Sequence, residues 1–213
     1  MSTLNKVTKK CAICGKEHTY IEVVSTMTSG YMDLDTRPPR MKRATLEYEI
    51  QFCNNCHYAN DDIETVIEGF KKETLQNPAY LKVVNDNNIN SIAKSFLLAG
   101  YLYANSKEYY EAGIQYLKAA WIFDDSQEID YAKRARVKAL QYLTIFVEET
   151  ENMNLAVLCV DLQRRTGDFL GAIETAQQLI DYGAEEFLTR ILKFEKKLSQ
   201  NNDSTCHNVG EVE

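Results

Sequence analysis

The stretches Cys11-Ala12-Ile13-Cys14 and Cys53-Asn54-Asn55-Cys56 decide how the first part of this 213-residue chain folds. Each stretch offers two thiols from one tight turn, and 38 residues separate the two pairs. In a compartment that keeps thiols reduced, paired Cys-x2-Cys spacing is typical of a metal site. Four thiolates complete a tetrahedral shell and leave no open position for catalysis, which suits structural zinc. The spacing therefore predicts one zinc ion held by Cys11, Cys14, Cys53 and Cys56.

The same cysteines allow other chemistry. Iron in a rubredoxin-like site uses the same four thiolates, and two redox dithiols or free buried thiols are further alternatives. His57 directly follows Cys56 and could replace it as a ligand, although the cysteine is the better-placed donor. We expect His18 to be a solvated strand residue and Cys159 to be a small apolar residue of a helix.

The sequence around the cysteines has the period of β-strands. Tyr20–Val24 is a short run rich in β-branched residues, and apolar residues alternate with polar ones from Leu46 to Phe52. Both patterns are typical of half-buried strands. Residues 1–60 are therefore predicted to form a small β zinc ribbon.

From residue 61 onward the period changes to that of helices. Asp61 or Asp62 can cap a helix that runs to about Gln76, and Pro78 lies in a linker. Further helices are expected near residues 91–105, 108–123, 127–149, 153–166, 169–182 and 184–198. The polar residues 199–213 are predicted to be a disordered tail. The predicted fold is thus mainly α with a small β zinc ribbon, followed over residues 61–198 by an antiparallel helical array.

Small and large residues recur in this helical part as they do in tetratricopeptide repeats. The pattern runs through Phe96, Ala99, Gly100, Tyr103, Ala112, Tyr116 and Ala119. The small residues would let two antiparallel helices approach, while the aromatic residues fill the seam. The segment Gly167–Leu179 repeats the turn and the second helix, so we expect one or two degenerate repeats.

Several stretches of the chain also resemble a known family. They are Cys11-Ala12-Ile13-Cys14-Gly15, Asp33-Leu34-Asp35-Thr36-Arg37-Pro38-Pro39, Phe52-Cys53-Asn54-Asn55-Cys56-His57-Tyr58-Ala59 and the helical segment from Leu162 to Ile173. Over residues 9 to 195 the chain resembles the bacterial domain of unknown function 2225. That family usually has C-P-x-C-G-Y at its second cysteine pair, where this chain has Asn54 and His57. The resemblance implies a zinc ribbon followed by tetratricopeptide-like helices, and it implies no activity.

Composition and charge exclude several classes of protein. The chain has 45% hydrophobic and 26% charged residues, as globular proteins do, and no run of 18 apolar residues that would span a membrane. Its first ten residues lack the apolar stretch of a secretory signal, which favours the cytoplasm. Residues 1–60 carry eight Lys and Arg against six Asp and Glu, whereas residues 61–213 carry sixteen against twenty-five. This excess of acidic residues disfavours a broad nucleic-acid interface.

Five residues outside the cysteine set are candidates for contact with a partner. Asp33, Asp35 and Arg37 could form a polar recognition loop between the cysteine pairs. Alternatively, and in our view preferably, they fasten this long loop by hydrogen bonds and ion pairs. Lys94 and Tyr101 lie on the helix face that would line a repeat groove, where stacking and apolar contact would hold a peptide. Core packing is the alternative for the helical aromatic residues.

Together these features predict a zinc-binding module that interacts with a protein or peptide partner. No nucleophile signature and no Gly-rich phosphate loop occur, and the chain has three histidines, which disfavours an enzyme. A nucleic-acid-associated regulatory protein is the first alternative, because the loop from Arg37 to Arg43 is basic. A redox or metal-handling enzyme that uses the Cys-x2-Cys pairs is the second.

Overall fold

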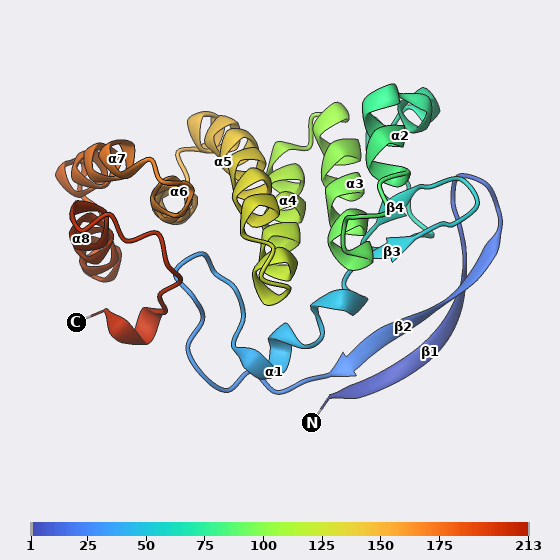
Figure 1. Cartoon of the computed structure of the whole chain (residues 1–213), viewed down its shortest axis with the longest axis horizontal. Coiled ribbons are helices and arrows are strands. Elements are labelled where there is room, and N and C mark those ends of the chain that lie inside the picture. Colours follow the sequence, from blue (N-terminus) through green and yellow to red (C-terminus); the bar gives the residue numbers. More distant parts are fainter. Residues whose placement is uncertain (1, 213) are drawn as a thin grey trace.

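The computed structural model describes residues 2–212. Two antiparallel hairpins lie in the N-terminal part, and a row of helices follows in sequence order from α2 to α8 (Figure 1). The predicted fold class, mainly α with a small β part at the N-terminus, is confirmed. Among residues 2–212, no helix combines the length and the apolar character needed to cross a membrane.

The longer hairpin is formed by β1 (Thr3–Lys10) and β2 (Glu17–Ser25), with Lys10 opposite Glu17 next to the turn. The strand predicted over Tyr20–Val24 lies within β2 and is confirmed. Sequence analysis gives no strand for β1. Most of its residues are polar and exposed, so no alternation of apolar and polar residues marks it.

The shorter hairpin pairs β3 (Gln51–Phe52) with β4 (Ala59–Asn60). The prediction of a strand from Leu46 to Phe52 is wrong for most of its length, because Leu46–Tyr48 is a 3₁₀ turn. Leu46 and Ile50 are nevertheless buried, so the alternating pattern correctly predicts that these apolar residues face the core. Within residues 2–212, β3 pairs only with β4. The residues before β3, from Leu46 to Ile50, therefore have no neighbouring strand with which to pair.

The helix predicted from Asp61 to Gln76 does not form. This segment consists of turns and ends in a short 3₁₀ helix at Lys72–Gln76. The Tyr58 hydroxyl donates to the carbonyl of Thr65 and accepts from the amide of Ile67, each at 3.0 Å. These side-chain bonds satisfy backbone groups that a helix would otherwise pair, so contacts with the shorter hairpin override the local helical period.

The helices of the row are α2 (Pro78–Val84), α3 (Ser91–Asn105), α4 (Tyr109–Asp125), α5 (Ile129–Thr150), α6 (Met153–Thr166), α7 (Phe169–Tyr182) and α8 (Glu186–Gln200). From α3 onward they agree with the predicted ranges to within two residues at each end. Pro78, predicted to lie in a linker, is instead the first residue of α2, where its missing amide costs no hydrogen bond. The side chain of Asn77 caps this helix.

Consecutive helices pack against one another along the row. A Cβ atom added at Gly100 in α3 would lie 3.0 Å from the ring of Tyr116 in α4, and one at Gly113 would lie 2.5 Å from Leu143 in α5. The predicted close approach of two helices at Gly100, with Tyr116 in the seam, is therefore confirmed. Assignment of these helices to tetratricopeptide repeats stays a prediction.

The segment from residue 33 to residue 61 lies along α4 and runs in the opposite direction. Its contacts, in order, are Arg37 with the Trp121 carbonyl at 3.0 Å, Glu49 with Lys118 at 3.1 Å, and Asp61 with Gln115 at 2.7 Å. Positions three apart share one face of a helix, so one face of α4 is covered by the N-terminal part. A short helix, α1 (Arg40–Arg43), interrupts this segment.

The prediction of a disordered tail after residue 198 is wrong. α8 continues to Gln200, and the residues that follow pack on the N-terminal loop. The Leu34 amide donates to the His207 carbonyl, and the Val209 amide donates to the Met32 carbonyl, each at 2.9 Å. Arg164 of α6 donates to two further carbonyls of the tail. These partners, which are distant in the sequence, satisfy the backbone hydrogen bonds of the tail. The polar composition of the tail had predicted that its backbone is exposed to solvent.

Buried apolar residues form two clusters. The first joins residues of the hairpins, among them Cys53 and Tyr58, to the helices α2 to α6. The second joins Leu34 to α6, α7 and α8. The first cluster continues across residue 60 without a gap, so packing does not mark the predicted boundary between residues 1–60 and 61–198. Whether the two parts fold separately stays a prediction.

Candidate metal centre

Each cysteine pair lies in the turn of one hairpin, Cys11 and Cys14 after β1, Cys53 and Cys56 after β3. The two turns have the same backbone hydrogen bonds. In each, the amide of the first cysteine donates to the carbonyl five residues further on, at 2.9 and 2.8 Å. The amide four residues further on donates back to the carbonyl of that cysteine, at 2.8 Å in both turns. Two turns of one geometry thus present their thiols to a common point.

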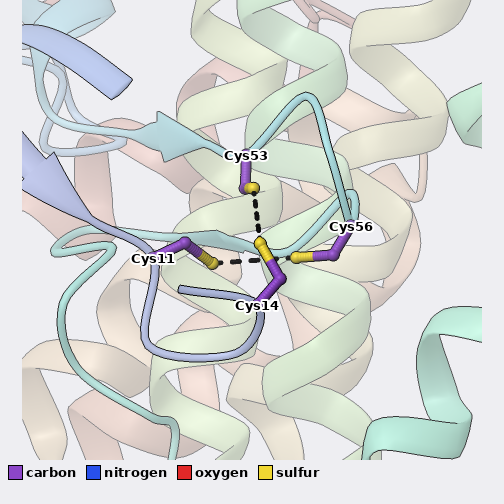
Figure 2. A group of neighbouring side chains, drawn as sticks. All are labelled: Cys11, Cys14, Cys53 and Cys56. Atoms are coloured by element: carbon purple, nitrogen blue, oxygen red, sulfur yellow. Dashed lines mark hydrogen bonds between the residues drawn. The ribbon is translucent and has the colours of Figure 1, made fainter. Parts of the chain in front are cut away.

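The four sulfur atoms converge between these turns (Figure 2). All four lie within 4.8 Å of one another, with 3.7 Å between the sulfurs of Cys11 and Cys56 and 3.5 Å between those of Cys14 and Cys53. A tetrahedral site with metal–sulfur bonds of about 2.3 Å places its sulfurs about 3.8 Å apart. The observed separations fit such a site, so the four cysteines could hold one metal ion.

Hydrogen bonds favour the thiolate form of one of the four cysteines, Cys14. Burial raises the pKa of Cys53 and of Cys56. Burial acts in the same sense on Cys14, but hydrogen bonds from the Lys16 amide and the Asn55 side chain outweigh it and lower the pKa of Cys14 to about 6. Four adjacent thiolates repel one another, so full ionisation of the set requires a bound cation.

Aromatic and imidazole groups surround the sulfurs. His18 lies in β2, as predicted, but it is half-buried and not fully solvated, and its Nε2 atom lies 3.2 Å from the sulfur of Cys53. The Tyr20 hydroxyl donates to the carbonyl of Phe52 at 3.0 Å and so joins the two hairpins. The His57 ring is stacked on the ring of Phe52, and among residues 2–212 the cluster of possible ligands contains cysteines only.

Two hydrogen bonds with helices and one with the segment that follows β4 hold the two hairpins in place. They run from the Tyr80 hydroxyl to the His57 carbonyl, from the Tyr103 hydroxyl to the Asn60 side chain, and from the Ala12 amide to the Ile63 carbonyl. Tyr80 belongs to α2 and Tyr103 to α3. The geometry of the metal centre therefore depends on the helical part as well as on the hairpins.

Asp35 and Arg37, two of the predicted loop residues, are buried, with 1% and 4% of their surface exposed. Asp35 accepts hydrogen bonds from Arg136 of α5 at 3.3 Å and from Arg165 of α6 at 3.0 Å. Arg37 pairs with Asp125 at the end of α4. Of the two roles considered for these residues, the structure supports the one in which they fasten the loop.

Asp33, the third loop residue, pairs with Arg43 at 2.7 Å and is also buried. Of the basic residues from Arg37 to Arg43, these pairs leave Arg40 and Lys42 exposed. Because only unpaired cations at the surface can contact phosphates, the basic character predicted for this loop is reduced to two residues.

Lys94 and Tyr101 are half-buried at the contact between α2 and α3. The Lys94 ammonium donates to the carbonyl of Val84 at 3.2 Å, and the ring centre of Tyr101 lies 5.5 Å from that of Tyr80. Both side chains therefore join α3 to α2. Their predicted role in holding a peptide stays a prediction.

Sequence analysis missed the buried ion pairs of the helices. Asp124 accepts from Arg136 at 3.0 Å and from Arg165 at 3.1 Å, and it shares both arginines with Asp35. One signal was available in the sequence. Arg136 lies on the same helical face as the buried Ala132 and Leu143, a face where an unpaired charge would be costly.

The fold and the site define a mainly helical protein with a four-cysteine centre built from two N-terminal hairpins. Over residues 4–201 the chain matches the model of a family described as "Uncharacterized protein conserved in bacteria (DUF2225)". This match spans most of the chain, which therefore belongs to that family, as the resemblance predicted. No curated protein and no solved structure matches the chain.

Proposed function

We propose that the four cysteines hold one structural zinc ion. The observation that supports this is the closed set of four sulfurs, which leaves no coordination position for a substrate or water. The ion would fix the two turns relative to each other, as a cross-link between the two hairpins. Iron fits the same ligands, and metal analysis of protein purified from its native cell distinguishes the two.

We further propose that the chain is a protein-interaction module of the cytoplasm and not an enzyme. Support comes from the exposed apolar side chains of the C-terminal helices, since large apolar groups at a surface are typical of interaction sites. Ile129, Leu170 and Tyr182 are each 76% exposed, and Phe187 is 47% exposed. These side chains belong to α5, α7 and α8.

Affinity capture from lysate of the native cell tests this role. The full-length chain is one bait, and a Leu170→Ser, Tyr182→Ser double variant is the matched second bait, because both side chains are exposed and their replacement spares the core. We expect a protein that the wild-type bait retains and the double variant loses. Equal capture by both baits would count against an interaction through these helices. Capture of nucleic acid in place of protein would favour the regulatory alternative.

A further inference from the structure

An apolar hollow lies where α5 ends, α6 begins and α7 ends. Its volume is about 260 Å³, and it is lined by Val147, Glu148, Glu151, Met153, Ala156, Leu179 and Tyr182. Small-molecule and cofactor sites usually have about 300–1,000 Å³. A hollow below that range fits an inserted side chain better than a cofactor. Tyr182 adds an exposed aromatic ring to its rim.

The charge around the hollow is negative. Glu148, Glu149 and Glu151 are exposed, and within residues 2–212 none of them forms an ion pair. They stand at the C-terminal end of α5, and α7 also ends here; neither helix has a basic residue in its last turn. A C-terminal helix end carries partial negative charge, so Glu148 and Glu149 are unfavourably placed, whereas Glu151 also lies beside the N-terminal end of α6, which favours an acidic residue. A cation from another molecule would remove this repulsion.

The end of α5 has a second unfavourable feature. Glu151 has a left-handed backbone with φ of 54°, as do Lys107, Gln127 and Asn202 after α3, α4 and α8, whereas α6 and α7 have Gly167 and Gly183 in that conformation. A residue with a Cβ atom pays a steric cost there that glycine does not. The chain thus keeps an acidic residue where glycine would stabilise the fold, directly beside an apolar hollow.

We propose that this hollow is the docking site for a partner segment that has one apolar anchor residue flanked by Lys or Arg. The inference deepens the proposed interaction role and rests on it. The anchor fills the space between Val147 and Leu179, and the flanking cations contact Glu148 and Glu151. A second copy of this chain is a poorer occupant, because residues 61–213 carry twenty-five acidic residues against sixteen basic ones.

A random dodecapeptide library displayed on phage and selected on the full-length, metal-loaded chain tests this proposal. We expect enrichment of peptides in which Leu, Ile, Phe or Met is flanked by Lys or Arg. For an enriched peptide measured by fluorescence anisotropy, Tyr182→Ser and Glu148→Lys should each weaken binding about tenfold, as loss of a central anchor or a paired charge does. The control Glu68→Lys makes the same charge change at an exposed site elsewhere and should leave affinity within about twofold.

Glu151→Gly separates binding from folding. It should raise the melting temperature, because glycine suits the left-handed position, and weaken peptide binding at the same time. Enriched peptides that bind all variants equally would overturn the docking site and leave the interaction role standing. Enrichment of acidic flanks, or a Tyr182-dependent dimer in light scattering, would also overturn the site. A library that yields no binder would count against the interaction role itself.

Discussion

Gly15 and His57 occupy the same position in the two metal-binding turns, and both have a left-handed backbone, with φ of 72° and 67°. Each follows the second cysteine of its pair, and each donates its amide to the carbonyl of the first. Glycine adopts this conformation without steric cost, whereas histidine does not. Two contacts offset the steric cost of the left-handed backbone at His57. The His57 ring stacks on Phe52, and the Tyr80 hydroxyl donates a hydrogen bond to the His57 carbonyl.

His57→Gly should therefore leave the metal content unchanged and should not lower the stability of the metal-loaded protein. His57→Val should lower it by about 1–2 kcal/mol, because a β-branched residue is least able to adopt a positive φ. Denaturant unfolding of the three proteins measures the difference. Equal losses for both variants would show that the imidazole ring, and not the backbone conformation, makes this position important.

The metal content should depend on Cys11, Cys14, Cys53 and Cys56 and on no other cysteine. Wild-type protein is expected to contain one zinc ion per chain by elemental analysis, and Cys53→Ser should lose most of it, because three thiolates no longer close the site. Cys159→Ser is the control, since Cys159 is a buried residue of α6 in the helical core. Two metal ions per chain, or loss of metal in the Cys159 variant, would contradict the assignment.

Removal of the metal should loosen α2 and α3 together with the hairpins. The hydrogen bonds of Tyr80 and Tyr103 connect these helices to the cysteine turns, and all of these elements share the first apolar cluster. Hydrogen exchange with and without a strong chelator should show lost protection at residues 3–25, 51–60 and 78–105. The helices α7 and α8 pack in the second cluster and should keep their protection.

Loss confined to the hairpins would instead support two separately folding domains with a boundary near residue 60. Loss throughout the chain would mean that the two clusters unfold as one cooperative unit.

The sequence predicted the features that depend on local spacing. The cysteine pairs are recognisable because metal coordination requires two thiols in one turn, and the helices from α3 onward follow from their apolar period. Features that depend on distant partners were not predictable. The bonds of Tyr58 to residues 65 and 67 replace the expected helix after Asp61, and Asp35 meets Arg165 across 130 positions of the chain. No local pattern in the sequence encodes such pairs.

Three charged residues, Asp161, Arg164 and Glu195, are fully or almost fully buried between α6 and α8. Arg164 donates to Glu195 and to Asp161, each at 2.6 Å. One oxygen of each carboxyl group, Oδ2 of Asp161 and Oε1 of Glu195, is buried and has no hydrogen-bond partner elsewhere in residues 2–212. One cation cannot neutralise two carboxylates, so we expect one of the two carboxyl groups to keep its proton.

Burial, followed by the nearby Asp161 carboxyl group, raises the pKa of Glu195 to about 8, although Arg164 opposes the shift. The folded protein therefore keeps a proton that the unfolded chain releases near pH 4.5. Stability from this group is fully present below that pH and falls as the pH rises toward 8, with a limiting slope of about 1.4 kcal/mol per pH unit. Asp203 and Glu211 have lowered pKa values, so their contribution changes in more acidic solution. Cys14, whose pKa is lowered to about 6, changes within this window in the opposite sense, so the contribution of Glu195 is the difference between the slopes of the wild type and a Glu195 variant.

Glu195→Gln should remove this dependence, because glutamine has the shape of the protonated acid and carries no ionisable proton. We expect the free energy of unfolding of the wild type to fall between pH 5.5 and pH 8, and that of the variant to change much less. Glu174→Gln, at an exposed position of α7, should keep the wild-type slope. Denaturant unfolding at four or five pH values across this window measures all three proteins. A Glu195→Gln slope equal to that of the wild type would show that both carboxyl groups are already ionised around Arg164 at pH 5.5.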